Sequence, residues 1–267
     1  MRRISFLITS LLLLSFATVA KQEITFATDL MPEQGNRKVD LVSSLVYYVT
    51  DTLQNEYQIS FQQASREREW RLVTKQNNVC LYNKTRTPER EKIAVFSSLP
   101  LIVYAPNRLI LNRNLDLPQP LSLTEIISLG LNIGVVKGRN YGEQLDLLIA
   151  KHSEHLYVGA GSYKAERLEV MLKQGKLDGI IEYSSVFKSR QPEAVINKDY
   201  YVYALKEAQQ AVKGFLACSD SNVGKQFIDD FEQVMLSEDY RTFAISKFNE
   251  AQNYIESAYI IEQLGYK

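Results

Sequence analysis

The chain has 267 residues, and 45% of them are hydrophobic, which is enough to build one large domain or two modest ones. Lysine and arginine together number 31, and aspartate and glutamate also number 31, so the formal net charge is zero. This balance excludes the strongly basic class of proteins whose net charge attracts nucleic acid or an anionic membrane.

The first twenty residues have the three parts of a secretory signal peptide. Arg2 and Arg3 form a basic start, residues 4–16 are almost all apolar, and residues 18–20 supply a cleavage site. We predict cleavage after Ala20 and export to the periplasm. Without Arg2 and Arg3, 29 basic residues (31 minus 2) face 31 acidic ones, a net charge of −2. The alternative is an uncleaved N-terminal anchor, although the apolar run is short for a membrane span.

The mature chain opens with alternating strands and helices. The apolar periodicity predicts strands at 24–28, 57–61, 79–82 and 101–104, with amphipathic helices at 39–53 and 66–75. This order is typical of a layered α/β unit with a largely parallel sheet.

A second unit repeats the pattern. Apolar runs at 109–111, 132–136, 156–158 and 177–183 alternate with helical patterns that begin at Ser122, near Leu145 and near Ala165. Ser122 and Glu125 have the spacing of a capping box. A strand at 214–218 and two or three helices close the chain.

The loop after the third strand carries hydroxyl groups and a candidate guanidinium, at Thr85 and Arg90. Pro88 favours a helical turn, with Glu89 at its positive end. Small ligands bind at the carboxyl ends of strands in open α/β sheets, and arginine can bind a carboxylate through two parallel hydrogen bonds. The alternative is a surface arginine that pairs with Glu89 or Glu91.

Both cysteines, Cys80 and Cys218, lie on apolar strands. In an exported protein they can form a disulfide, and the alternative is two buried thiols. His152 and His155 are interpreted as a solvated helix end, so neither a metal nor a cofactor is expected. Trp70, the only tryptophan, is interpreted as a core residue instead of a stacking platform.

Three motifs give the chain a family resemblance. Residues 85–90 with Phe96 and Ser97 resemble a threonine turn followed by Glu-Arg and Phe-Ser; residues 134–138 read Gly-Val-x-Lys-Gly; residues 175–179 read Gly-x-x-Asp-Gly. Over nearly the whole mature chain, this resembles the bacterial extracellular solute-binding proteins of family 3 type, which include polar amino-acid binders. The resemblance implies the type II periplasmic binding protein fold: two α/β lobes, each a mostly parallel sheet flanked by helices, joined by two hinge crossovers and closing around a ligand.

The resemblance also implies a division of the chain. Residues 21–104 would form the first part of lobe 1, residues 105–212 lobe 2, and residues 213–267 the return to lobe 1 with the C-terminal helices. Both cysteines then fall in lobe 1, on strands that this fold places side by side. A Cys80–Cys218 disulfide is therefore expected.

By the same resemblance, Arg90 corresponds to the arginine that binds a ligand carboxylate, and Thr85 to the hydroxyl beside it. The other positions implied to face the ligand are Tyr82 and Asn83 at a strand end, Asp29 and Met31 on the first-strand loop, and Lys137, Asn140 and Tyr141 on a lobe 2 loop at a helix N-terminus that suits an anionic group.

One position departs from the pattern. Amino-acid binders normally offer an aspartate to the α-ammonium group at the tip that here reads Glu182-Tyr183. If Glu182 does not substitute for it, the ammonium group has no partner. A carboxylate-bearing or aromatic-stacked ligand then fits better than a plain amino acid.

The leading hypothesis is a monomeric, non-enzymatic solute-binding protein that delivers a small polar, carboxylate-bearing solute to a membrane permease of an ABC transporter or reports it to a membrane sensor. One alternative is a periplasmic dehydratase-like enzyme on the same fold, with Glu182 as a general acid of raised pKa. The other is a receptor-docking module that binds no ligand.

Overall fold

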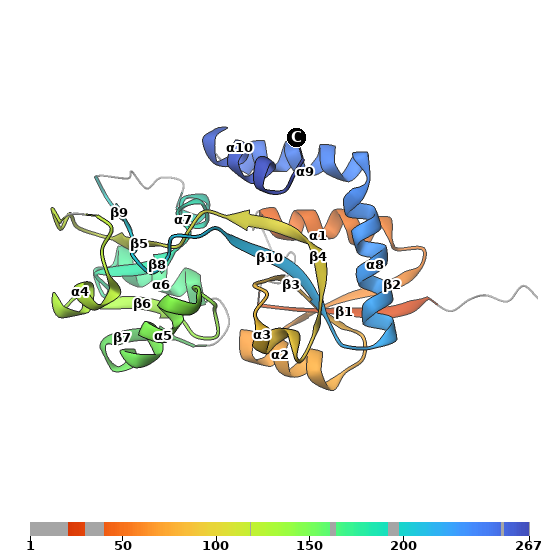
Figure 1. The fold of residues 1–267 in the computed structure, drawn as a ribbon, viewed down its shortest axis with the longest axis horizontal. Helices are drawn as coiled ribbons and strands as arrows, with labels where there is room; N and C mark the ends of the chain where they lie inside the picture. The colour runs from red at the N-terminus through yellow and green to blue at the C-terminus, as the bar shows by residue number, and fades with distance from the viewer. Residues whose placement is uncertain are drawn as a thin grey trace, which may run out of the picture.

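The chain folds into two α/β lobes that lie next to each other (Figure 1). The computed structural model describes residues 21–29, 40–117, 119–160, 164–191, 198–251 and 254–266. The predicted signal peptide at residues 1–20 and the candidate Met31 lie outside these ranges. No helix within the described ranges combines the length and apolar character needed to span a bilayer.

Lobe 1 is built on a five-stranded sheet with the strand order β2-β1-β3-β10-β4. Its strands are β1 (Gln22–Thr28), β2 (Tyr57–Gln63), β3 (Val79–Lys84), β4 (Val95–Tyr104) and β10 (Val212–Cys218). Its helices are α1 (Leu41–Thr52), α2 (Arg66–Lys75), the single-turn α3 (Pro88–Glu91), α8 (Asn222–Leu236), α9 (Glu238–Ala251) and α10 (Tyr254–Gln263).

Lobe 2 is built on a second five-stranded sheet with the order β7-β6-β8-β5-β9. Its strands are β5 (Arg108–Leu111), β6 (Ile133–Val136), β7 (Leu156–Gly159), β8 (Gly179–Glu182) and β9 (Tyr201–Ala204). Its helices are α4 (Leu123–Ser128), α5 (Glu143–Lys151), the 3₁₀ turn η1 (Ser153–His155), α6 (Lys164–Lys173) and α7 (Ser184–Arg190).

In both sheets only one strand is reversed. In lobe 1, β1 pairs in parallel with β2 and β3, whereas β10 is antiparallel to β3 and to β4, so β4 runs with the other three. In lobe 2, β6 is parallel to β7 and β8, whereas β5 is antiparallel to β8 and β9. Each reversed strand is the first one after the chain crosses between lobes. The prediction of two mostly parallel sheets flanked by helices is confirmed.

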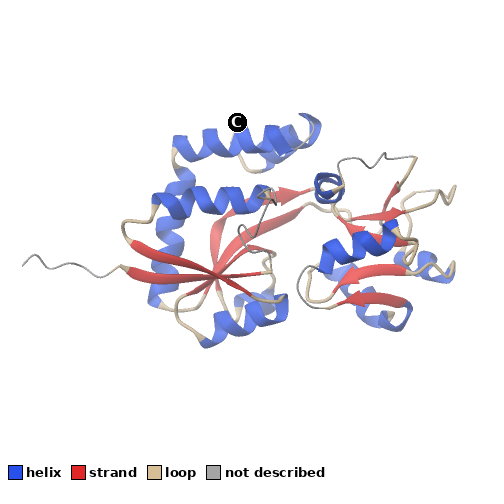
Figure 2. Ribbon diagram, turned by 180° about the vertical axis from the view of Figure 1, so that it is seen from behind, coloured by secondary structure: helices blue, strands red, loops and turns tan. Residues whose placement is uncertain are grey.

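Alternating side chains divide the lobe 1 sheet between two apolar layers, as expected for strands buried on both faces. One layer, with α1 and α8, contains Phe26, Cys80 and Leu216, whereas the other, with α2, contains Leu81 and Ala217. Figure 2 shows helices on both sides of this sheet. Because the two faces are covered, the polar strand ends are the part of the sheet that is left to meet a ligand.

The two cysteines join the reversed strand of lobe 1 to its neighbour. Cys80 on β3 and Cys218 on β10 are register partners in the antiparallel pair, and both are fully buried. They form a disulfide. The expected Cys80–Cys218 pairing is confirmed, and the alternative of two free buried thiols is wrong.

Two segments carry the chain between the lobes. β4 ends at Tyr104 and leads to β5, while β10 begins at Val212 and brings the chain back, and Tyr104 and Val212 are register partners. Figure 1 shows these two strands running side by side toward lobe 2. Asn107, just after β4, is fully buried and donates its side-chain amide to the carbonyl of Tyr141 at 3.5 Å.

The structure differs from the sequence-based expectation in three elements. β4 begins at Val95, six residues before the predicted strand, and contains Pro100. Proline gives no N–H to a ladder, and the register of β4 with β10 shifts at Phe215, the partner of Pro100. The other two elements, α7 and β9, were not predicted; both are short and lack a clear apolar period.

Candidate functional site

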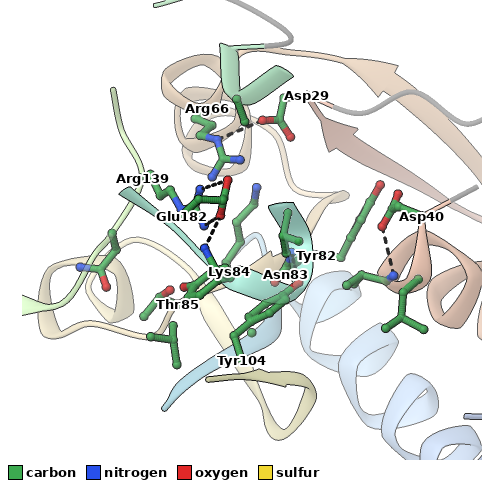
Figure 3. Close-up of a pocket in the computed structure, with 18 of the residues that line it drawn as sticks. Asp29, Asp40, Arg66, Tyr82, Asn83, Lys84, Thr85, Tyr104, Arg139 and Glu182 are labelled. Carbon is green, nitrogen blue, oxygen red and sulfur yellow. Dashed lines mark hydrogen bonds and ion pairs between the residues drawn. The ribbon is translucent and has the colours of Figure 1, made fainter. Parts of the chain in front are cut away.

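A cavity of about 640 Å³ lies between the two lobes. Lobe 1 lines it with residues after β1, at the start of α1, on α2 and at the end of β3, and lobe 2 lines it with the loop after β6, the end of β8 and α7. Figure 3 shows these side chains converging from the two sides. The cavity is therefore at the strand ends where the fold places ligands.

Most of the residues proposed from the sequence line this cavity. They are Asp29, Tyr82, Asn83, Thr85, Arg90, Asn140, Glu182 and Tyr183. Two do not. Lys137 is exposed in the turn after β6, and Tyr141 is buried in the apolar core of lobe 2, where its hydroxyl accepts a hydrogen bond from the Val136 N–H at 2.8 Å. Lys137 and Tyr141 therefore do not line this cavity.

Arg90 extends from α3 into the cavity. The Thr87 side chain caps this single turn by accepting a hydrogen bond from the Arg90 N–H. The guanidinium donates from Nη1 to the Thr85 carbonyl at 2.9 Å and from Nη2 across the cleft to the Gly138 carbonyl at 3.4 Å. Its carbon lies 4.8 Å from the centre of the Trp70 ring. Arg90 is thus held by two carbonyl groups and one aromatic face.

Arg90 has no ion pair with a carboxylate within the described part of the chain. The proposed surface pairing with Glu89 or Glu91 is wrong, because Glu91 pairs with Arg86 at 2.5 Å instead. Burial lowers the pKa of Arg90, against the pull of Asp146. A partly buried guanidinium without a counter-ion is suited to binding an anion.

Trp70 has two roles. It is half-buried and packs with Phe96, with the ring centres 6.3 Å apart, which is the predicted core position. It also lines the cavity and stacks beneath the Arg90 guanidinium. Trp70 is therefore a core residue, as predicted, and also a stacking platform for the Arg90 guanidinium, which was not predicted.

Two further ion pairs belong to lobe 1. Arg66 donates to Asp29 at 3.0 Å, and Lys84 contacts the fully buried Glu69 at 2.5 Å. Burial alone would raise the pKa of Asp29, but Arg66 and Lys84 hold it below its ordinary value. Burial raises the pKa of Glu69 in spite of Lys84. Asp29 and Glu69 are therefore already matched by a cation.

Glu182, at the end of β8, is only 2% exposed and forms ion pairs with two arginines. Arg139 contacts both of its oxygens, with 2.7 Å between Nη1 and Oε2, and Arg190 lies 3.6 Å away. Burial alone would raise the pKa of Glu182, but Arg139 and then Arg190 hold it below its ordinary value. The alternative of Glu182 as a general acid with a raised pKa is contradicted.

Tyr183 occupies the position where amino-acid binders normally have an aspartate. It is nearly buried and belongs to an aromatic stack. Its ring lies parallel to Tyr104, with centres 4.3 Å apart and planes at 8°, and the Arg139 guanidinium lies 4.6 Å from its centre. Asn83, whose backbone has φ 56°, donates its amide to the Tyr104 hydroxyl at 3.0 Å. The stack spans both lobes next to the crossovers.

The loop before α5 already hydrogen-bonds to a carboxylate of the chain, that of Asp146. Asp146, on the first turn of that helix, accepts a hydrogen bond from the Asn140 side-chain amide at 2.6 Å and another from the Tyr141 N–H at 2.9 Å. The carboxylate of Asp146 therefore occupies the donors at this helix N-terminus that were expected to bind an anionic group of the ligand. Arg139, between the two predicted residues Lys137 and Asn140, is the residue of this loop that the sequence reading missed.

The comparisons with known proteins agree with this geometry. Neither a protein-family model nor a curated protein sequence matches the chain. Among solved structures, a protein studied for glutathione import via GshT and the cystine ABC importer TcyBC of Streptococcus mutans is similar, with 13% identity, TM-score 0.67, and coverage of 87% of this chain and 95% of that one. The chain has the two-lobed periplasmic binding protein fold.

Two other solved structures have this binding-protein fold and bear on arginine. The amino acid ABC transporter substrate-binding protein AbpA of Streptococcus pneumoniae, bound to L-arginine, has 18% identity, TM-score 0.58, and coverage of 91% of this chain and 94% of that one. The Salmonella typhimurium periplasmic binding protein STM4351, studied for arginine specificity, has 14% identity, TM-score 0.59, and coverage of 83% and 96%. At these identities the likeness concerns the fold and not the ligand.

Proposed function

We propose that this protein is an exported solute-binding protein that captures a small carboxylate-bearing solute between its lobes and does no chemistry on it. The observation that carries the proposal is Arg90: a guanidinium in an interlobe cavity of about 640 Å³, held by the Thr85 carbonyl and the Trp70 ring, with no carboxylate partner among the described residues. A ligand carboxylate would supply the missing counter-ion.

One hydrogen bond and one ion pair join the two lobes across the cleft. Arg90 reaches the Gly138 carbonyl, and Lys164 on α6 lies 3.4 Å from Glu67 on α2. A solute that binds both lobes would add to these contacts and favour the closed arrangement over an open one. The two crossovers at Tyr104 and Val212 are the segments about which such closure would occur.

The solved neighbours are described as ABC importer and substrate-binding proteins, and this supports a membrane permease as the partner. A membrane sensor that reads the closed form is the second candidate partner. The signal peptide predicted at residues 1–20 is consistent with either role, because both act outside the cytoplasm.

A melting screen of the purified mature chain over amino acids, polyamines and small carboxylates tests the proposal. A ligand present at about 100 times its Kd should stabilise the native state by roughly 2.7 kcal/mol, which is a readily measured rise in Tm. A rise with one or more carboxylates supports solute binding. If no compound in the screen raises the Tm, the ligand-free docking module takes its place.

A further inference from the structure

We propose that the cleft is built for a small acid that lacks an ammonium group, such as a 2-oxo or a hydroxy carboxylate, and selects against the matching α-amino acid. This inference rests on the proposed function, since it concerns the solute of the same cavity. It comes from what each charged and aromatic side chain on the cavity wall already contacts.

An ammonium group needs an acceptor that is free when the ligand arrives, and the described carboxylates of the wall are all engaged. Five carboxylate side chains line the cavity: Asp29, Asp40, Glu69, Glu182 and Glu250. Asp29, Glu69 and Glu182 pair with Arg66, Lys84 and Arg139, and Asp40 caps α1 by accepting from the Val42 and Ser43 N–H groups at 3.0 and 3.1 Å. Glu250, which is exposed, pairs with Lys247 at 2.7 Å.

The tightest of these pairs, Arg139–Glu182, is at the tip of β8, where amino-acid binders normally offer a carboxylate to the ammonium group. Glu182 uses both oxygens on Arg139 and has Arg190 within 3.6 Å. Turning it toward a ligand would leave Arg139, whose side chain is only 9% exposed, without its counter-ion, which is strongly unfavourable. Figure 3 shows Glu182 lying against Arg139, and Asp29 against Arg66.

Aromatic faces are the other groups that bind ammonium ions, and two of those on the wall already carry an arginine. Arg90 stacks on Trp70 at 4.8 Å, and Arg139 stacks on Tyr183 at 4.6 Å. Tyr183 also stacks on Tyr104. The two rings are therefore used for holding cations of the protein in place.

The balance of charge on the wall favours an anion with no positive group. Seven cationic side chains line the described wall against the five carboxylates. They are Arg66, Lys84, Arg90, Arg139, Lys188, Arg190 and Lys213. A zwitterion would bring its ammonium group into an excess of positive charge, whereas a 2-oxo acid brings only the carboxylate and a carbonyl that can accept a hydrogen bond.

The test is calorimetric titration of the purified mature protein with matched pairs that differ at one group: 2-oxoglutarate and glutamate, pyruvate and alanine, phenylpyruvate and phenylalanine. We expect at least one 2-oxo acid to bind about tenfold or more tightly than its amino acid. If amino acids bind as tightly or more tightly, the inference is overturned while solute binding stands. If none of the six binds, the inference is also overturned, and the melting screen decides whether the proposed function falls with it.

A gain-of-function pair sharpens the result. Tyr183→Asp places a carboxylate at the tip of β8, and it should improve the binding of the amino acid relative to its 2-oxo partner by about tenfold. Val170→Asp, which adds a carboxylate at an exposed position of α6 outside the cavity, is the control and should leave the preference unchanged. A folded Tyr183→Asp protein, checked by circular dichroism, that shows no such gain contradicts the inference. If this variant does not fold, the three matched pairs decide the question on the wild-type protein.

Discussion

The two lobes share one sheet topology but present opposite electrostatic situations to the cleft. Lobe 1 offers Arg90, a cation with no carboxylate partner among the described residues. Lobe 2 offers Glu182, a carboxylate held by two arginines. The region at the ends of the corresponding strands β3 and β8 thus carries a cation without a carboxylate partner in one lobe and a closed ion-pair network in the other. From this difference we infer that the carboxylate of lobe 2 is part of the cavity wall, and we propose that lobe 1 recognises the solute.

Breaking the network of lobe 2 should have the largest effect. Glu182→Gln removes the counter-ion of Arg139, whose side chain is only 9% exposed, while Arg190 keeps its pair with Glu169. We expect a loss of about 3–5 kcal/mol in the free energy of unfolding, measured by urea denaturation. Glu154→Gln, which removes an exposed partner of His155, is the matched control and should change it by less than about 1 kcal/mol. Equal effects of the two changes would show that the network does not stabilise lobe 2.

Breaking the covalent link of lobe 1 is the next largest change. The disulfide closes a long loop, because Cys80 and Cys218 are 138 residues apart in the sequence and lobe 2 lies between them. Replacing both cysteines by alanine should cost about 2–5 kcal/mol. The Tm of the wild-type protein should fall when dithiothreitol is added, whereas the Tm of the double variant should not respond. A double variant as stable as the oxidised wild type would contradict a stabilising role.

The network of lobe 2 also predicts a pH dependence. Glu169 on α6 pairs with Arg190 at 3.0 Å, and burial raises its pKa to about 7 despite that arginine. Because the pKa is raised on folding, the native protein holds this proton more tightly than the unfolded chain does. The contribution is therefore favourable at low pH and is lost as the pH rises from about 4.5 to about 7, by an amount on the order of 3 kcal/mol.

Glu169→Gln tests this sign. The difference in unfolding free energy between the wild type and Glu169→Gln should shift against the wild type between pH 5 and pH 8. Glu182→Gln should behave in the opposite sense, since the pKa of Glu182 is lowered and its contribution is lost on acidification. Differences that are flat in pH would contradict the titration of Glu169.

The smallest expected effect concerns the contact between the lobes. Lys164 and Glu67 face each other across the cleft at 3.4 Å, with the Glu67 side chain 39% exposed. Lys164→Met should weaken solute binding by less than about fivefold, since a partly exposed pair is worth about 1 kcal/mol or less. Calorimetric titration of the solute into this variant measures it. A loss of affinity as large as that caused by Arg90→Ala would show that the Lys164–Glu67 contact matters as much for solute binding as Arg90 does.

Much of the fold could be predicted because its signals are local. The alternating run around Phe26, the continuous apolar run around Leu81 and the amphipathic pattern of α1 are each complete within about a dozen residues. β9 could not be found in this way, because its four residues form a strand through pairing with β5. α7 was missed because it is short and has no clear apolar period, and Arg190, the second partner of Glu182, was missed with it.

The candidate site was predictable where a loop motif fixes the side chain and not where a partner does. Arg90 was predicted to face the cavity from the family resemblance of the loop motif after β3. In the loop after β6, the sequence offers both Lys137 and Arg139, and the left-handed turn at Gly138 (φ 77°) lies between them. Arg139 faces inward because Glu182, 43 residues later, receives it. Nor could the apolar character of Trp70 distinguish a core position from the wall of a cavity.

The most direct test of the account is calorimetric titration of the carboxylate found in the melting screen into the wild type, Arg90→Ala and Arg86→Ala. Arg86 is a matched control, because it belongs to the same loop but is exposed and pairs with Glu91 outside the cavity. Loss of a bidentate charge-assisted contact predicts that Arg90→Ala weakens binding by about 100-fold, while Arg86→Ala stays within about twofold of the wild type. Equal affinity of the Arg90→Ala and wild-type proteins would contradict the central claim.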